Sequence, residues 1–416
     1  MFKLSEKYEI DRKILKCDYI RYSPSEISTI NTPNSQIYIN IPREDSVISL
    51  LNSYIEINFD VLKATTSNRY ADTDDIRLIN LGPIALFSNY KLTTSSGKHL
   101  ENIDHAHIVS LMYKLLSSSR DSDDLAIGFD RSRDKRKREL LDNKAQKGKF
   151  HLRIYLKDVF SFAEYQEVGT FGLSYRLTLT RNTDNAVLNK NGATNIGKIK
   201  INGIEWYVPH YVPSIDEYNK LMIQIKNKTS TNLHYPEKSV FMKEVNTQNF
   251  WTFELGTQEG VNVPIWVFVA FQQQDRQHDQ TLNNDTFYRM PITSAQCIIG
   301  TEKYPDSATL LNYDDDDYSQ GYGQIKDAFR FLTKDNILQP YISEDDFRSD
   351  NNGNNIGYNI HVFDIRYQKN YQSGQSVKVE FKLDKVVPAG IYGYALVLTN
   401  RLVSISSDGQ RMLDLV

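Results

Sequence analysis

Cysteine is scarce in this chain of 416 residues, which contains only Cys17 and Cys297. Two thiols so far apart in sequence cannot form a disulfide framework or a zinc site built from cysteines. This usage predicts two reduced thiols in an intracellular compartment.

Neither sign of charge predominates, because the chain has 49 Lys+Arg and 52 Asp+Glu residues and a formal net charge of -3. No field over the whole surface can therefore attract nucleic acid or membrane, and a partner recognised by charge needs a local patch. Hydrophobic residues make up 40% of the chain, which supplies enough apolar material for a core and excludes wholesale disorder.

Long apolar runs are absent. The longest, VPIWVFVAF at residues 263–271, falls short of the roughly 18–20 residues that a membrane-spanning helix requires. We therefore expect a buried strand there and no membrane span. The N-terminal residues MFKLSEKYEIDRK carry charges where a secretory signal needs a continuous apolar region of about 7–15 residues, so we expect no signal peptide.

Motifs for nucleophilic or nucleotide chemistry are missing: there is no Gly-x-Ser-x-Gly, no phosphate-binding glycine-rich loop and no dinucleotide fingerprint. His105 and His107 would diverge on a helix, which predicts surface or capping histidines. The acidic run at residues 314–317 lacks the alternating ligands of a calcium loop, which predicts a solvated loop. We expect no enzyme, no cofactor and no metal. A glycosidase carboxylate pair stays open, because its separation of about 5–9.5 Å cannot be read from sequence.

Alternation of apolar and polar residues dominates what is present. In residues 53–61, Ile55, Ile57, Phe59 and Val61 alternate with polar side chains, as in a half-buried strand. The same period of two recurs at residues 37–41, 152–156, 173–179, 221–225 and 377–383. Asn202-Gly203, Ser96-Gly97 and Asp408-Gly409 offer residues that tolerate the positive φ of tight turns. These features predict an all-β protein of sandwiches or barrels.

Two helices interrupt the predicted strands. Residues 103–117 place their apolar side chains on one helical stripe. Ser214 and Glu217 have the spacing of a capping box, which predicts a short helical connector near the middle of the chain. Strand-rich segments of similar length flank this connector, so we expect two β-domains in tandem, without a residue-by-residue repeat.

Two stretches, residues 117–149 and 304–357, break the strand pattern and are predicted to be long loops, which are usually functional or bind partners. The first contains a basic cluster. Its members are Arg131, Arg133, Lys135, Arg136, Lys137 and Arg138. Such a cluster can contact nucleic acid or act as a nuclear-import signal, and it can equally be a solvated charged loop. These interpretations stay open.

Specific segments also resemble a known family. In the first half they are FSFAEYQE at 160–167, YRLTLTRNTDNA at 175–186 and IEWYVPH at 204–210. In the second half they are FVAFQ at 268–272, FD at 363–364, VPA at 387–389, YALVL at 394–398 and SSDG at 406–409. In order and spacing, over about residues 35 to 416, they resemble the major capsid proteins of Polinton (Maverick) elements and adintoviruses. Val208 separates the paired aromatics from Pro209, a departure from the family pattern, and the basic cluster has no family role to carry over.

The resemblance implies a double jelly roll: two tandem eight-stranded β-sandwiches with a few inserted helices and long loops. The expected division is an N-terminal arm at 1–36, a first jelly roll at 37–213 and a second at 214–416. The implied function is that of a major capsid protein whose homotrimers are pseudo-hexameric and tile an icosahedral shell around double-stranded DNA. The implied partners are copies of itself, neighbouring capsomers, penton and minor capsid proteins, and packaged DNA bound non-specifically. Its implied location is the virion capsid, with assembly in the host nucleus or cytoplasm. From residue chemistry alone, a β-sandwich carbohydrate-binding module or glycosidase is the alternative.

Overall fold

The computed structural model describes residues 13–70, 76–120, 128–129, 148–190, 196–246, 249–256, 263–282, 284–334, 338–349, 357–368, 375–409 and 412–414. Strands of the first half are β1 Ile14–Tyr22, β2 Gln36–Ile41, β3 Val47–Ile48, β4 Tyr54–Lys63, β5 Ile76–Leu78, β6 Phe87–Thr94, β7 His99–Asp104, β8 Lys149–Tyr155, β9 Thr170–Phe171, β10 Tyr175–Arg181, β11 Leu188–Lys190 and β12 Gly197–Pro213. Strands of the second half are β13 Ser230–Glu244, β14 Phe250–Leu255, β15 Val263–Gln273, β16 Ile292–Ile299, β17 Glu302–Leu310, β18 Ile360–Asp364, β19 Val377–Leu383, β20 Ile391–Ser406 and β21 Met412–Asp414.

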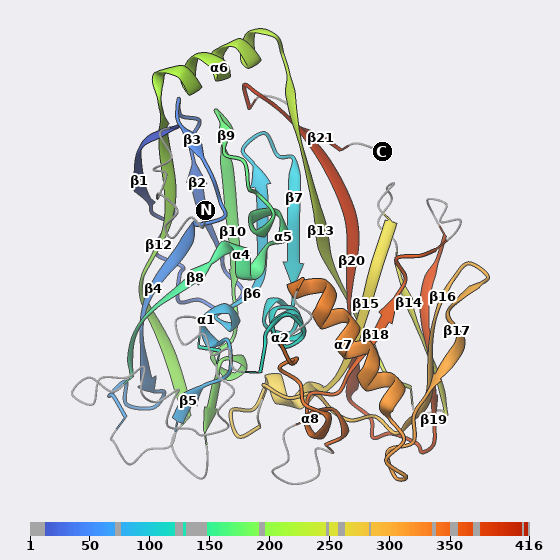
Figure 1. The fold of residues 1–416 in the computed structure, drawn as a ribbon. Helices are drawn as coiled ribbons and strands as arrows, with labels where there is room; N and C mark the ends of the chain where they lie inside the picture. The colour runs from blue at the N-terminus through green and yellow to red at the C-terminus, as the bar shows by residue number, and fades with distance from the viewer. Residues whose placement is uncertain are drawn as a thin grey trace, which may run out of the picture.

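The helices are shorter elements inserted between these strands. They are α1 Gly82–Ala85, α2 Ala106–Ser117, α4 Leu156–Val159, α5 Ser161–Glu164, α6 Ile215–Lys226, α7 Ser319–Thr333 and α8 Glu344–Arg348, with 3₁₀ turns η3 Asp184–Ala186 and η4 Gln274–Gln277. Figure 1 shows α2 and α7 near the centre of the molecule and α6 crossing from the end of β12 to the start of β13. Within the described residues, none of the helices combines the length and apolar character that a membrane span needs.

The first sandwich pairs two antiparallel sheets. One has the order β8-β4-β12-β3-β9, with β1 on the other side of β12, and the second has the order β2-β10-β6-β7. The alternation in β4 explains the packing, because Ile55, Ile57 and Phe59 are buried between the sheets while the residues between them are partly exposed. β5 and β11 form a small separate pair.

The second sandwich is built in the same way. One sheet has the order β13-β20-β15-β18, with β21 beside β20, and the other has the order β14-β19-β16-β17. Trp251 on β14 packs against Phe271 on β15 and Phe381 on β19, so aromatic side chains join its two sheets. Apart from β21, each strand of the second sandwich has a counterpart in the first: β1-β12-β4-β8 matches β13-β20-β15-β18, and β2-β10-β6-β7 matches β14-β19-β16-β17. Each sandwich thus pairs two sheets of four matched strands, and the repetition of this order in the second sandwich forms a double jelly roll, as the resemblance implied.

Several local predictions were wrong. Residues 304–357 are not one loop: β17 continues to Leu310 and two helices follow, because apolar residues of α7 such as Ile325 and Phe329 recur at helical spacing and are buried. Residues 221–225 belong to α6 rather than a strand, since alternation over five residues cannot distinguish a strand from one face of a helix. Residues 14–22 of the predicted arm form β1 and pair with β12.

Two further boundaries differ from the prediction. The helix expected at 103–117 begins at Ala106, because Ile103 pairs with Tyr90 across β7 and β6. Asn202-Gly203 does not turn the chain; it forms a bulge inside β12, where the register against β4 shifts between Ile201 and Gly203. By contrast, the turns at Gly97 (φ 89°) and Gly409 (φ 67°) are confirmed, with the positive φ that favours glycine.

Candidate assembly surfaces

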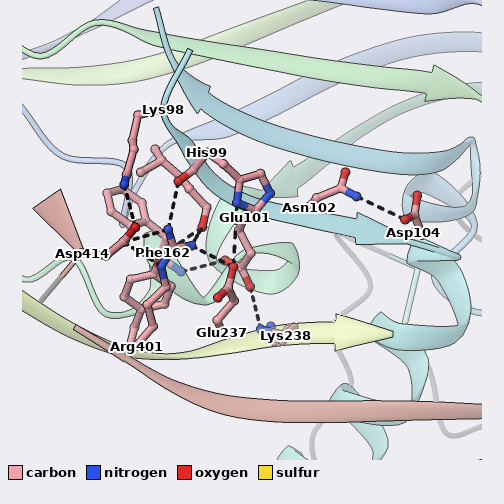
Figure 2. A network of polar contacts seen from close by, with 12 residues as sticks. Lys98, His99, Glu101, Asn102, Asp104, Phe162, Glu237, Lys238, Arg401 and Asp414 are labelled. Atoms are coloured by element: carbon pink, nitrogen blue, oxygen red, sulfur yellow. Dashed lines mark hydrogen bonds and ion pairs between the residues drawn. The ribbon is translucent and has the colours of Figure 1, made fainter. Parts of the chain in front are cut away.

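The two sandwiches meet at a buried polar network centred on Arg401 of β20, which is 5% exposed. Its guanidinium donates to the main-chain oxygens of Leu100 (2.5 Å) and His99 (3.1 Å) on β7. It also forms ion pairs with Glu237 on β13 (2.8 Å) and Asp414 on β21 (3.0 Å). Figure 2 shows these groups converging from strands of both sandwiches. One side chain therefore ties β7 of the first sandwich to three strands of the second.

A second set of contacts lies beside Arg401. The fully buried carboxylate of Glu101 on β7 accepts hydrogen bonds from the main-chain N–H of Phe162 (3.0 Å) and of Lys238 on β13 (3.2 Å). The ammonium of Lys238 donates to the Val159 carbonyl oxygen (3.2 Å) and lies 3.8 Å from the centre of the Tyr113 ring. Polar groups of the two sandwiches thus satisfy each other where both are removed from water.

Burial sets the electrostatics of this contact. It raises the pKa of Glu237 to about 7, with the nearby charge of Glu101 adding to the effect and Arg401 opposing it. Burial likewise raises the pKa of Glu101, which the positive charge of Lys238 opposes. We call this contact the inter-sandwich joint; its members are Leu100, Glu101, Tyr235, Glu237, Lys238 and Arg401. These buried charged groups pair with one another across the contact, so the joint links β7 of the first sandwich to β13 and β20 of the second.

The outer face of the first sandwich carries a row of tyrosines across adjacent strands. Tyr54 of β4 stacks on Tyr207 of β12 with ring centroids 5.1 Å apart, and it contacts Tyr155 of β8 at 5.7 Å and Tyr19 of β1 at 5.8 Å. The guanidinium of Arg153 lies 4.7 Å from the Tyr54 ring centre. We call Tyr19, Tyr54, Tyr155 and Tyr207 the tyrosine face. Tyrosine and arginine are enriched in protein–protein interfaces, because they give large contact areas together with hydrogen bonds.

The end of the molecule that carries α6 is another exposed surface. Ser214 is the N-cap of this helix, and its side chain accepts from the Glu217 N–H (3.4 Å). Only this half of the predicted capping box forms, because the Ser214 N–H donates to the Lys13 carbonyl oxygen and not to Glu217. None of its side chains is buried; Ile215 is 75% and Ile223 59% exposed. A cavity of about 550 Å³ separates α6 from the neighbouring ends of β9, β13 and β20.

The structure describes some of the residues that the sequence singled out. Arg131, Arg133, Lys135, Arg136, Lys137 and Arg138 lie outside the described residues. His107 is not a surface residue: it is buried, its Nε2 lies 2.8 Å from the Asn80 carbonyl oxygen, and burial lowers its pKa. The acidic run at 314–317 is exposed, as expected, and borders a cavity of about 730 Å³ in which Asp314 pairs with Lys385 (3.5 Å). No group of three or more possible metal ligands occurs among the residues that the structure describes.

Sequence reasoning missed the inter-sandwich joint. Glu237 and Lys238 follow one another on β13 with no sign in the sequence that both are buried. Arg401 did offer a signal, since it is a lone cation in the otherwise apolar or neutral stretch from Tyr394 to Val403. A cation in such a strand needs buried partners, because an unpaired charge in the interior is very costly.

The fold and the joint define a protein of two matched jelly rolls held in a fixed relation. The family model described as "Double jelly roll-like domain" matches residues 134–403, and the chain belongs to this family. No curated protein matches this chain.

Solved structures share the fold over nearly the whole chain. A chain of the Sputnik virophage structure is 11% identical with a TM-score of 0.59, covering 100% of this chain and 91% of that one. The PBCV-1 virus capsid gives 11% identity and a TM-score of 0.58, covering 99% of both chains. The mavirus major capsid protein gives 12% identity and a TM-score of 0.55, covering 99% of this chain and 92% of that one.

Proposed function

We propose that this chain is a major capsid protein, a structural subunit rather than an enzyme. The observation that carries the proposal is the shared fold: 99% of the chain superposes on the mavirus major capsid protein and on a chain of the PBCV-1 capsid. The resemblance of the sequence to capsid proteins of Polinton elements and adintoviruses supports the same role, and we propose that type for this chain.

The subunit would assemble as a homotrimer that tiles an icosahedral shell around double-stranded DNA. The inter-sandwich joint supports this, because it makes each chain a rigid two-lobed unit, and three such units around one axis present six similar lobes. A pseudo-hexagonal outline of this kind can pack on a closed shell. Neighbouring capsomers, penton proteins and minor capsid proteins would be its further partners. The virion would be its location, with assembly in the nucleus or cytoplasm of the host.

We further propose that the jelly rolls divide between residues 213 and 214, where α6 begins and connects β12 to β13. β1 would then be the first strand of the first jelly roll. The basic cluster at residues 131–138 is proposed to contact packaged DNA or to direct nuclear import. Replacing Arg131, Arg133, Lys135, Arg136, Lys137 and Arg138 with Gln should weaken DNA retention in particles or move the protein out of the nucleus. Unchanged retention and unchanged location would dismiss both roles.

The carbohydrate-binding or glycosidase alternative has less support. The carboxylates beside Asp314 are solvent-exposed, with 76% of the Asp314 side chain accessible. Glu101 and Glu237, whose pKa burial raises, are 0% and 3% exposed and bonded within the chain, where a saccharide cannot reach them. A glycosidase general acid is instead held where an apolar environment raises its pKa.

Particle formation tests the proposed function. The chain should be expressed alone and together with candidate penton and minor capsid proteins, and the products should be imaged by electron microscopy. We expect icosahedral shells whose faces show pseudo-hexagonal tiles. Failure to form either shells or tiles, at any salt concentration at which the chain stays folded, would count against a capsid role.

A further inference from the structure

The two sandwiches repeat one strand order, so each strand of the inter-sandwich joint has a counterpart in the other sandwich. β13 of the second sandwich occupies the place that β1 has in the first, at one edge of the β13-β20-β15-β18 sheet. β7 of the first sandwich occupies the place that β17 has in the second, at the edge of the other sheet. The joint brings β7 and β13 together, which leaves β1 and β17 as its unused equivalents.

β7 and β13, the two strands that meet in the joint, bury side chains against each other. On β13 the four consecutive residues from Tyr235 to Lys238 are all buried, although successive side chains of a strand point to opposite faces. Tyr235 donates from its hydroxyl to the Leu100 carbonyl oxygen on β7 (3.1 Å), beside the bonds that Arg401 makes to the same strand. Contact with β7 therefore seals the outer face of β13 as well as its inner one.

The equivalent strands, β1 and β17, are largely exposed to solvent. Eight of the nine residues of β1 are exposed, including Leu15 (70%) and Tyr19 (48%). β17 is exposed along most of its length, and Leu310 at its end is 58% exposed. Apolar side chains on an edge strand are an interaction surface, because the strand also presents main-chain groups that a second chain can approach.

We propose that β17 of one copy covers β1 and the tyrosine face of the next, and so repeats between chains the joint that β7 and β13 make within a chain. This rests on the proposed function and names the surfaces that the trimer would use. The contact is head-to-tail: one surface lies on each sandwich, so every copy offers both halves. A ring then closes with alternating joints, one inside each chain and one between chains.

The chemistry of the two surfaces agrees with this pairing. Within the chain, Arg401 and Tyr235 contact carbonyl oxygens of β7. On the sheet that carries the tyrosine face, the side chains of Arg21 on β1 and Arg153 on β8 are 61% and 49% exposed, although each already pairs with a carboxylate of that sheet, Glu205 or Glu56. The facing strand β17 lies at the edge of its sheet, and its exposed residues include Glu302 and Asp306 as well as one cation, Lys303. Arginine and tyrosine on one side thus meet carbonyl and carboxylate oxygens on the other.

Cysteine cross-linking tests the proposed contact with a residue the chain already has. Cys17 lies exposed on β1, and Cys297 is buried. Three single variants, Lys303→Cys, Asp306→Cys and Ser307→Cys, place a second accessible thiol along β17. A disulfide requires Cα atoms about 4.4–6.8 Å apart, so it reports direct contact. We expect oxidation to give covalent species of two and three chains from at least one variant, and none when Cys17→Ser is added.

Glu254→Cys is the matched control, because Glu254 is exposed on β14 at the opposite edge of the same sheet. Cross-linking from this position as strong as from β17 would overturn the inference. So would a trimer, seen by light scattering, that yields no cross-link from any β17 position; the proposed function would then survive. A chain that stays monomeric and uncross-linked would overturn both.

A pair of substitutions tests the same surface without cysteine. Tyr19→Glu places a charge within the proposed contact and should weaken association at least tenfold while the melting temperature of the monomer stays unchanged. Tyr38→Glu is its control: Tyr38 is 39% exposed and lies on β2, in the other sheet of the same sandwich. Equal association of the two variants would contradict the assignment.

Discussion

Removing the Arg401 side chain tests whether the inter-sandwich joint holds the two jelly rolls together. In Arg401→Met the Glu237 carboxylate loses its ion pair of 2.8 Å while remaining almost fully buried. The main-chain oxygens of His99 and Leu100 lose their hydrogen bonds from Arg401, although Leu100 keeps the one from Tyr235. Removing one partner of a buried ion pair costs about 3–5 kcal/mol, mostly because the other charge is left without compensation. We expect a loss of that size at pH 8.

The double variant Glu237→Gln/Arg401→Met should be less destabilised than Arg401→Met, because it leaves no unpaired charge. Urea unfolding followed by tryptophan fluorescence measures both, since Trp206, Trp251 and Trp266 are all buried. Arg330→Met is the control: Arg330 forms an exposed pair with Asp327, and such surface pairs contribute about 0–1 kcal/mol. The reasoning fails if Arg401→Met costs no more than Arg330→Met, or if the double variant is no more stable than Arg401→Met.

Three further outcomes follow from the buried groups and from glycine packing. The pKa of Glu237 is raised from 4.5 to about 7, so protonated Glu237 stabilises the fold fully below about pH 4.5 and this stabilisation is lost as the pH rises through 7. The unfolding free energy of the wild type relative to Glu237→Gln should thus fall by about 2–3 kcal/mol from pH 4.5 to 8; a difference that is flat with pH would refute the assignment. Gly393→Ala should cost about 1–3 kcal/mol in thermal melts, because its Cβ would overlap the Trp251 ring. Gly323→Ala in α7 has open space around the new Cβ and should be neutral or stabilising, so equal melting temperatures for the two variants would contradict the packing argument.

The fold was predictable from sequence because its main signal is local. Alternation at 53–61 and 377–383 fixes which side chains face the sandwich interior, and these strands are confirmed as β4 and β19. The helix α7 was missed because its buried residues are interspersed with polar ones and two glycines, within a segment rich in turn-forming residues. A local sequence pattern describes one element at a time. It therefore predicts a strand more reliably than a helix such as α7, whose buried residues contact both halves of the chain.

The joint was harder to predict, because it depends on residues distant in sequence. Glu101 and Lys238 are 137 positions apart, and Leu100 and Arg401 are 301 apart. Neither Glu101 nor Glu237 stands out in the sequence of its own strand. Only the packing of the second sandwich on β7 removes both carboxylates from water. The same limit applies to β1 and β17, whose equivalence to β13 and β7 becomes visible only when the strand orders of the four sheets are compared.

The mass of the purified chain in solution tests the central claim most directly. Light scattering behind size exclusion, repeated over a range of concentration and salt, should give a species of three times 48.1 kDa, as a head-to-tail ring of three two-lobed subunits requires. A chain that remains at 48.1 kDa throughout, while its unfolding shows an intact fold, would contradict the account of a trimeric capsid subunit.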